Sequence, residues 1–296
     1  MSSTTVIEDV IVAPSGRKIG FLARGPISGR VVLHLHGAPG SRREQLLVFP
    51  DAVLDRFGIR AVSVDRPGYG NTDPLPGSRV ERVQDVLEVA DALGIDRFAL
   101  VGVSCGGSNV LTLAAVVPRR VDRVVLLCGQ MPYDDEDAIV TLQPAQLAGL
   151  PFLRQGRSQL IERMCEQTRT AHLVDPVAAF AEGTATLSAR EKAWYAQPWV
   201  RDAFVADMQE AFRASAEGII DDGLTMVRPF EVDVSTVSCP VRAVHGSADD
   251  WEPLPNLRRV LDQLNDVQLF VLEGLNHFGS IMYPDLVAML CTEQTS

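Results

Sequence analysis

The sequence predicts an α/β fold, in which a mostly parallel central sheet carries helices on both faces and a helical cap is inserted into it. Between residues 30 and 129, apolar strand-like runs alternate with amphipathic runs of helical period. This alternation is typical of parallel strands joined by crossover helices. It stops between residues 131 and 233, where only short helices are favoured, and it resumes from residue 239. We therefore expect a core of residues 1–130 and 234–296, with residues 131–233 as the cap.

Local patterns predict each element in turn. Residues 5–13 and 18–25 read as two strands, and the Pro-Ser-Gly-Arg stretch between them signals a hairpin turn. Residues 30–37 are apolar on both faces, as a central parallel strand should be. Further strands are predicted at 59–65, 97–104, 121–129, 239–246 and 267–274. Helices outside the cap are predicted at 44–58, 78–94, 106–118, 256–265 and 280–293.

Composition excludes several classes of function. The 296-residue chain has a net charge of −11, whereas nucleic-acid binding requires a basic surface. No apolar run approaches the roughly 20 residues that span a bilayer, and the first residues lack the pattern of a secretory signal. The five cysteines are scattered and odd in number, which indicates neither a disulfide framework nor a zinc site. We expect a soluble cytoplasmic protein with a small-molecule substrate and no metal or other cofactor.

Ser104 is the candidate nucleophile. It ends a predicted strand in Leu-Val-Gly-Val-Ser-Cys-Gly-Gly, with Gly102 before it and Gly106 and Gly107 after it, and a predicted helix follows. A sharp strand-to-helix turn pushes the side chain at its apex outward and leaves no space for side chains two positions away. This arrangement is the G-x-S-x-G nucleophile elbow.

A serine hydroxyl needs a base to accept its proton, and the base needs a carboxylate to orient it. His277 follows the last predicted strand, at the sheet edge where parallel strands place ligands, and is the preferred base. Asp249 and Asp250 follow the preceding strand, and Asp249 is the preferred acid. The remaining histidines are more simply explained, His34 and His245 as packing residues and His172 as a surface or pocket residue.

The sequence resembles the α/β-hydrolase fold family. Three further stretches carry the resemblance: His-Gly-Ala-Pro-Gly-Ser at 36–41, Asp-Arg-Pro-Gly-Tyr-Gly-Asn-Thr-Asp-Pro at 65–74, and Gly-Ser-Ala-Asp-Asp-Trp-Glu-Pro at 246–253. The family also uses the chain order Ser, Asp, His and usually inserts a cap at this place.

An oxyanion hole needs backbone N–H groups close to the developing charge. Cys105 offers one at a helix start, where N–H groups are free and the helix dipole favours an anion. The resemblance places the second donor on Ala38 and gives His36 a structural role in the same loop. The thiol of Cys105 is expected to point away from the site.

These features predict a serine hydrolase that cleaves a small, mostly apolar ester, thioester or lactone through an acyl-enzyme. The resemblance argues against epoxide hydrolases and haloalkane dehalogenases, which use Asp at the elbow. It leaves open a C–C bond hydrolase, a triad-based cyclase or lyase, and a non-catalytic ligand-binding receptor. The His-Gly-Ala-Pro-Gly stretch is also similar to proline iminopeptidases, which hold a free amino group with cap carboxylates. Candidates for that role are Glu162, Glu166, Glu210 and Glu217, and candidates for lining an apolar pocket are Phe152 and Trp194.

Overall fold

The computed structural model describes residues 5–185 and 187–293. Its centre is an eight-stranded sheet in the order β1-β2-β4-β3-β5-β6-β7-β8. The strands are β1 (Thr5–Val12), β2 (Lys18–Gly25), β3 (Arg30–Leu35), β4 (Ile59–Val64), β5 (Phe98–Val103), β6 (Val121–Leu127), β7 (Val241–Gly246) and β8 (Val267–Leu272). Strand β2 pairs antiparallel with β1 and β4, and all the other neighbouring strands pair in parallel. The predicted mostly parallel sheet is confirmed.

The helices cover both faces of this sheet. They are α1 (Gln45–Val48), α2 (Asp51–Phe57), α3 (Arg79–Arg82), α4 (Gln84–Ala92), α5 (Gly106–Val116), α6 (Glu136–Ile139), α7 (Pro144–Arg154), α8 (Gln159–Val174), α9 (Pro176–Gly183), α10 (Ala189–Tyr195), α11 (Pro198–Ala211), α12 (Glu217–Met226), α13 (Leu254–Leu261) and α14 (Pro284–Thr292). Three short 3₁₀ turns, η1 (Arg42–Glu44), η2 (Val234–Thr236) and η3 (His277–Met282), complete the described elements.

Two predicted helices are interrupted. The helix expected at 44–58 is divided between α1 and α2, because Pro50 has no N–H to donate and forces Phe49 out of the helical region, to a ψ of 77°. The helix expected at 78–94 is likewise two helices, α3 and α4, which meet at Val83. Its start is as predicted, since Ser78 and Glu81 form a capping box.

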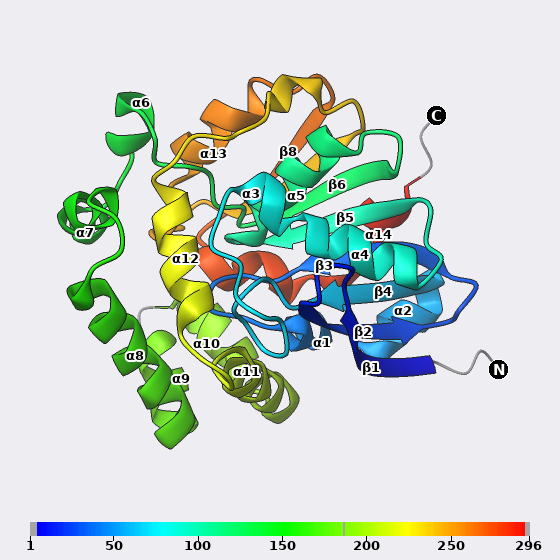
Figure 1. Cartoon of the computed structure of the whole chain (residues 1–296), viewed down its shortest axis with the longest axis horizontal. Coiled ribbons are helices and arrows are strands. Elements are labelled where there is room, and N and C mark those ends of the chain that lie inside the picture. The colour runs from blue at the N-terminus through cyan, green and yellow to red at the C-terminus, as the bar shows by residue number, and fades with distance from the viewer. Residues whose placement is uncertain (1–4, 186, 294–296) are drawn as a thin grey trace.

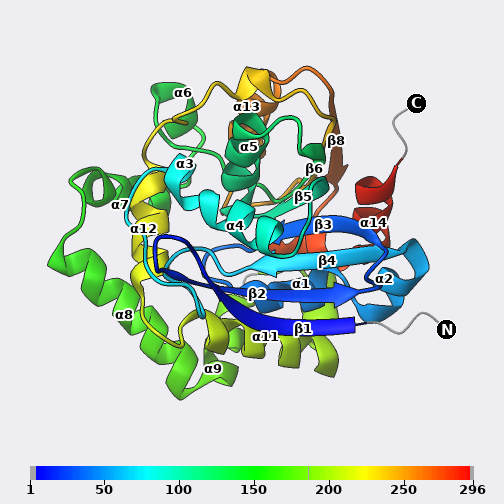
Figure 2. The ribbon, with the colours of Figure 1, turned by 45° about the vertical axis from the view of Figure 1, so that its right-hand side comes forward.

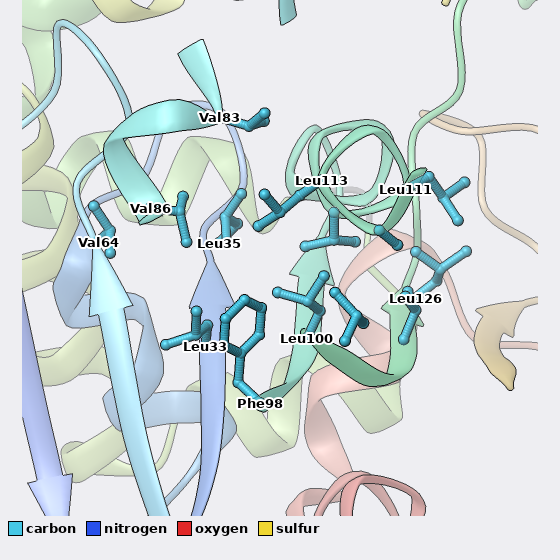
Figure 3. Packing of buried hydrophobic residues seen from close by; sticks show 14 of the residues in the cluster. Leu33, Leu35, Val64, Val83, Val86, Phe98, Leu100, Leu111, Leu113 and Leu126 are labelled. Atoms are coloured by element: carbon cyan, nitrogen blue, oxygen red, sulfur yellow. The ribbon is translucent and has the colours of Figure 1, made fainter. Parts of the chain in front are cut away.

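Two apolar clusters hold the layers together. On one face, Val86 of α4 and Leu113 of α5 pack against Leu33 and Leu100 of the sheet (Figure 3). On the other face, Val32 of the sheet packs in a cluster with residues of α2, α10 and α14. Figure 2 shows α4 and α5 above the sheet and α11 below it. Burial on both faces explains why the central strands are continuously apolar.

Residues 131–233 are helical, as predicted, and contain no strand among the positions that the structure describes. Helices α7, α8 and α12 of this segment lie beside one end of the sheet (Figures 1 and 2). Tyr195 and Val200 join the same apolar cluster as α2 and α14, so the segment packs directly on the core. Within the two described ranges, every helix is too short or too polar to cross a membrane.

Candidate active site

Ser104 lies in the turn between strand β5 and helix α5. Its φ is +50°, a left-handed conformation that is uncommon for a residue other than glycine. A Cβ on Gly102 would lie 2.6 Å from the carbonyl oxygen of Gly106, and a Cβ on Gly106 would lie 2.2 Å from that of Leu35. Because both clashes are with backbone atoms, only glycine fits at either position. The turn therefore has the geometry of a nucleophile elbow.

A hydrogen-bonded chain of three side chains starts at Ser104. Its Oγ lies 2.9 Å from Nε2 of His277, and Nδ1 of His277 lies 2.8 Å from Oδ2 of Asp249. All three side chains are buried, although they come from the ends of three different strands. With its proton on Nδ1, the imidazole donates to Asp249 and keeps Nε2 free to accept the hydroxyl proton. The structure thus brings together the three residues that the sequence singled out.

Asp249 is held in place by its own loop. Its Oδ1 accepts hydrogen bonds from the backbone N–H groups of Trp251 at 3.0 Å and Glu252 at 2.9 Å. The neighbouring Asp250 is exposed and turned to solvent. Of the two aspartates, Asp249 is therefore the one that can act on the imidazole.

Asp249 and His277 each favour the charged form of the other. Burial opposes ionisation of Asp249, but the attraction of His277 and the hydrogen bond from it hold the pKa of the carboxyl below its usual value. Burial lowers the pKa of His277, but Cys128 and the Asp249 carboxylate raise it above its usual value. The site therefore stabilises the imidazolium, and His277 can accept the serine proton only in its neutral form. Asp249 is thus a carboxylate at neutral pH and stabilises the imidazolium that proton transfer would create.

The two expected oxyanion donors flank the elbow. Ala38 follows strand β3 and lines the same cavity as Ser104, and Cys105 precedes the first residue of α5. Neither backbone N–H is hydrogen-bonded to another residue of the described ranges. The Cys105 thiol contacts the side-chain oxygen of Gln130 and lines a separate, smaller cavity. Burial raises the pKa of this thiol to about 12, which leaves it protonated and a poor nucleophile.

A cavity of about 100 Å³ opens onto Ser104 and His277. Its walls are mainly apolar, and helices α8, α9 and α11 close it opposite the sheet. These helices contribute the side chains of His172, Phe204, Asp207 and Met208, and Thr184 follows directly after α9. Its volume is below the roughly 150 Å³ of an engineered cavity that holds benzene, so the space next to Ser104 suits a short group.

Two carboxylates in the cavity wall were not singled out by the sequence. Asp207 of α11 accepts hydrogen bonds from the hydroxyl and the N–H of Ser41, at 2.5 and 2.9 Å. Glu44 accepts from the N–H of Gly37 at 3.2 Å and lies 3.1 Å from Nε2 of His34. Burial and the nearby Glu44 raise the pKa of Asp207 well above its usual value. Acidic residues in helical runs are usually solvated, so no local pattern marks these two.

Neither of the two residues expected to line the pocket, Phe152 and Trp194, lines the cavity beside Ser104. Phe152 is 48% exposed on α7. Trp194 instead packs edge-on against Tyr195 and Trp199, with ring centroids 4.8 and 5.9 Å apart. Amphipathic spacing identifies apolar side chains but does not say which of them face a site and which face another helix.

The four glutamates considered for binding an amino group all pair with arginine. Arg157 binds Glu162 and Glu217, each at 2.6 Å, and Arg169 binds Glu166 at 2.7 Å. Arg42 binds Glu210 at 2.8 Å. None of these four glutamates lines the cavity beside Ser104.

The fold and the elbow serine define a class, the α/β-hydrolase-fold proteins with a serine at the strand-to-helix turn. The family model described as "alpha/beta hydrolase fold" matches residues 30–280, and the chain belongs to this family.

Similar proteins differ in their reported activities. A 2-hydroxy-6-oxononadienedioate/2-hydroxy-6-oxononatrienedioate hydrolase of Paraburkholderia phymatum is 43% identical over 102 residues, which is 33% of this chain and 35% of that protein. The chain therefore matches only about a third of this relative's length. The putative carbamate hydrolase RutD of a Caulobacter species is 25% identical over 85% of this chain and 90% of its own. A thermophilic esterase of Thermogutta terrifontis is similar in structure, with a TM-score of 0.68, 20% identity and 96% of each chain covered.

Proposed function

We propose that this protein is a serine hydrolase that cleaves a small, mostly apolar ester, thioester or lactone through an acyl-enzyme. The proposal is carried by two hydrogen bonds beside a mainly apolar cavity. Ser104 Oγ lies 2.9 Å from His277 Nε2, and His277 Nδ1 lies 2.8 Å from Asp249 Oδ2. A serine becomes a strong nucleophile when a base positioned in this way accepts its proton.

The reaction proposed has two halves. Nε2 of His277 accepts the proton of Ser104 as Oγ attacks the acyl carbon, and the N–H groups of Ala38 and Cys105 stabilise the negative carbonyl oxygen. The imidazolium, stabilised by Asp249, then gives its proton to the leaving oxygen or sulfur. A water molecule repeats the attack on the acyl-enzyme with His277 as base, which releases the acid and restores Ser104.

We also propose that residues 131–233 act as a cap that sets the choice of substrate. Helices α8, α9 and α11 of this segment supply one wall of the cavity, including Phe204 and Met208. A cover of this kind excludes water and limits the length of the acyl group.

The C–C bond hydrolase alternative is less well supported. The printed substrate of the Paraburkholderia relative is a dioate, which carries two carboxylates. The described lining of the cavity contains no Arg or Lys, and it contains Glu44 and Asp207. A wall without a cationic side chain offers no partner to the two carboxylates of such a substrate.

One observation favours a second candidate, cleavage next to a free amino group. Glu44 and Asp207 line the cavity and could face an ammonium group. Against it, the raised pKa of Asp207 disfavours its charged form, and Glu44 already accepts the Gly37 N–H. A prolyl p-nitroanilide turned over faster than p-nitrophenyl butyrate would decide for this candidate.

The direct test is turnover of p-nitrophenyl acetate and butyrate together with labelling by a fluorophosphonate. The proposal predicts both, and it predicts that Ser104→Ala removes both. Labelling without turnover of any ester, thioester or lactone would favour a receptor, a cyclase or a lyase on the same fold.

A further inference from the structure

Arg66, on the loop after strand β4, reaches the peptide that carries the N–H of Ala38. Its Nη2 donates to the carbonyl oxygen of Gly37 at 2.7 Å, and its Nε donates to that of His36 at 3.0 Å. We infer that Arg66 is a positioning residue for the oxyanion hole, because it fixes and polarises the Gly37–Ala38 peptide. This inference rests on the proposed function, in which the Ala38 N–H stabilises the oxyanion.

The geometry of one peptide plane connects Arg66 to that N–H. The Gly37–Ala38 bond is trans, so its C=O and N–H point in opposite directions. The Gly37 oxygen also lies 2.7 Å from Nδ1 of His36, so two donors fix its direction. A fixed oxygen fixes the opposite N–H. A charged donor on the carbonyl also draws electron density from the amide and strengthens its N–H as a donor.

Arg66 also sets the tautomer of His36. The backbone N–H of Arg66 donates to Nε2 of His36 at 2.9 Å, so this nitrogen carries no proton and Nδ1 carries it. Burial and the guanidinium of Arg66 hold the pKa of His36 well below its usual value, and the ring stays neutral. Nδ1–H is then a donor to the Gly37 oxygen. One hydrogen bond on this oxygen thus comes from the Arg66 side chain. The other depends on the Arg66 backbone N–H, which a side-chain substitution keeps.

The guanidinium is in turn held by the helical segment 131–233. Asp222 of α12 accepts from Nη1 of Arg66 at 2.6 Å and from the hydroxyl of Tyr69 at 2.7 Å. Burial opposes ionisation of Asp222, but Arg66 and Arg82 hold the pKa of its carboxyl below its usual value. Arg66 is 3% exposed, so this ion pair is little screened by water. Hydrogen bonds through Arg66 thus connect the Gly37–Ala38 peptide to α12.

Arg82 provides a matched control. It is 4% exposed and donates to the same Oδ1 of Asp222, at 3.1 Å, but it makes no hydrogen bond to the loop of His36 and Gly37. Arg66→Met and Arg82→Met each remove one cation from Asp222. Only the first also removes the charged donor from the Gly37 carbonyl, which keeps the hydrogen bond from His36. Thermal unfolding of both variants measures the shared structural cost.

The experiment compares kcat, KM and inhibition in the two variants, with p-nitrophenyl butyrate as substrate. Loss of an oxyanion donor typically lowers kcat about 10²- to 10³-fold. We expect Arg66→Met to lower kcat about 10²-fold with KM nearly unchanged, and Arg82→Met to keep kcat within a few-fold. The affinity for a trifluoromethyl ketone, which forms an anionic adduct with a serine, should fall in parallel with kcat/KM.

Arg66→Lys keeps the inference testable if Arg66→Met does not fold. Lysine retains the charge beside Asp222 but cannot span two carbonyl groups as the guanidinium does. We expect it to fold and to lose kcat, again with little change in KM. Equal kcat in the folded Arg66 variants and Arg82→Met would overturn the inference. A wild-type protein that neither turns over esters nor reacts with a fluorophosphonate would instead overturn the proposed function, and the inference with it.

Discussion

The carboxylate of Asp249 lies 2.8 Å from Nδ1 of His277, while the side chain of Asp250, next in the sequence, is exposed to solvent. Two chemically identical neighbours thus differ completely in what they can do. Asp249→Asn would leave the shape of the loop but replace the acceptor for Nδ1–H with a group that favours the wrong tautomer. We expect kcat to fall by about 10⁴-fold in this variant and by no more than a few-fold in Asp250→Asn. Steady-state kinetics on one ester measures both, and a larger loss at Asp250 would contradict the assignment.

The adjacent residues Ser104 and Cys105 should also differ sharply. Ser104→Ala is expected to lower kcat by about 10⁴-fold or more, because no nucleophile remains. Cys105→Ala should keep most of the activity, since its backbone N–H is unchanged and its thiol points into another cavity. Both variants should unfold near the wild-type temperature. Retention of a tenth of wild-type turnover by Ser104→Ala would show that the nucleophile lies elsewhere.

Met208 should control the length of the acyl group. It is 4% exposed and lines the cavity, so Met208→Ala lengthens the space beside Ser104. We expect the ratio of kcat/KM for a hexanoate ester to kcat/KM for the acetate ester to rise about ten-fold. A difference of one or two methylene groups in an apolar pocket typically changes kcat/KM by at least this factor. The same change should cost about 2–5 kcal/mol of stability.

Phe152→Ala is the control for this prediction, because Phe152 belongs to the same helical segment but is 48% exposed. It should change stability by no more than about 0.5 kcal/mol and leave the ranking of esters as it is. An unchanged ranking in Met208→Ala would argue that this wall does not select the substrate.

Glu252 should make the stability of the fold depend on pH. Its buried carboxyl accepts from the N–H of Met131 and from the hydroxyl of Tyr133, which ties the Asp249 loop to the chain after β6. Burial raises the pKa of Glu252, and the hydrogen bonds from Tyr133 and Met131 lower it. Burial has the larger effect, so the pKa is about 8. The folded protein thus keeps a proton that the unfolded chain has already lost.

The sign of the effect follows from that difference. The contribution of Glu252 to stability is fully present below the usual carboxyl pKa of 4.5 and is lost as the pH rises through about 8. Glu252→Gln has no such proton to lose. The Tm of Glu252→Gln minus that of the wild type should therefore increase from pH 5 to pH 9. A constant difference over this range would show that Glu252 does not titrate in this way.

The sequence was sufficient for the elements whose signals are local. Glycines around Ser104, the apolar strands and the Ser78–Glu81 cap each impose a steric or hydrogen-bonding requirement on their own neighbourhood. Contacts between distant segments have no such signal. The pairing of Asp222 with Arg66, separated by 156 positions, depends on how α12 packs and could not be read from either residue.

Side-chain orientation in residues 131–233 could not be predicted from the sequence either. The helices of this segment could be predicted from period and caps, but whether Phe152 or Phe204 faces the cavity depends on how each helix is rotated against the core. The single helix predicted at 44–58 was wrong for a different reason: proline at position 50 removes a helical hydrogen bond, a local signal that the prediction did not use.

The site of a covalent adduct identifies the nucleophile directly. The protein would be mixed with a fluorophosphonate, digested and sequenced by tandem mass spectrometry, with Cys105→Ala treated in parallel. Fragmentation separates Ser104 from Cys105, which lie in one peptide. We expect one adduct, on Ser104, at unchanged yield in Cys105→Ala and absent from Ser104→Ala. An adduct on a cysteine, or ester hydrolysis that continues while Ser104 is fully labelled, would contradict the role of Ser104 as the nucleophile.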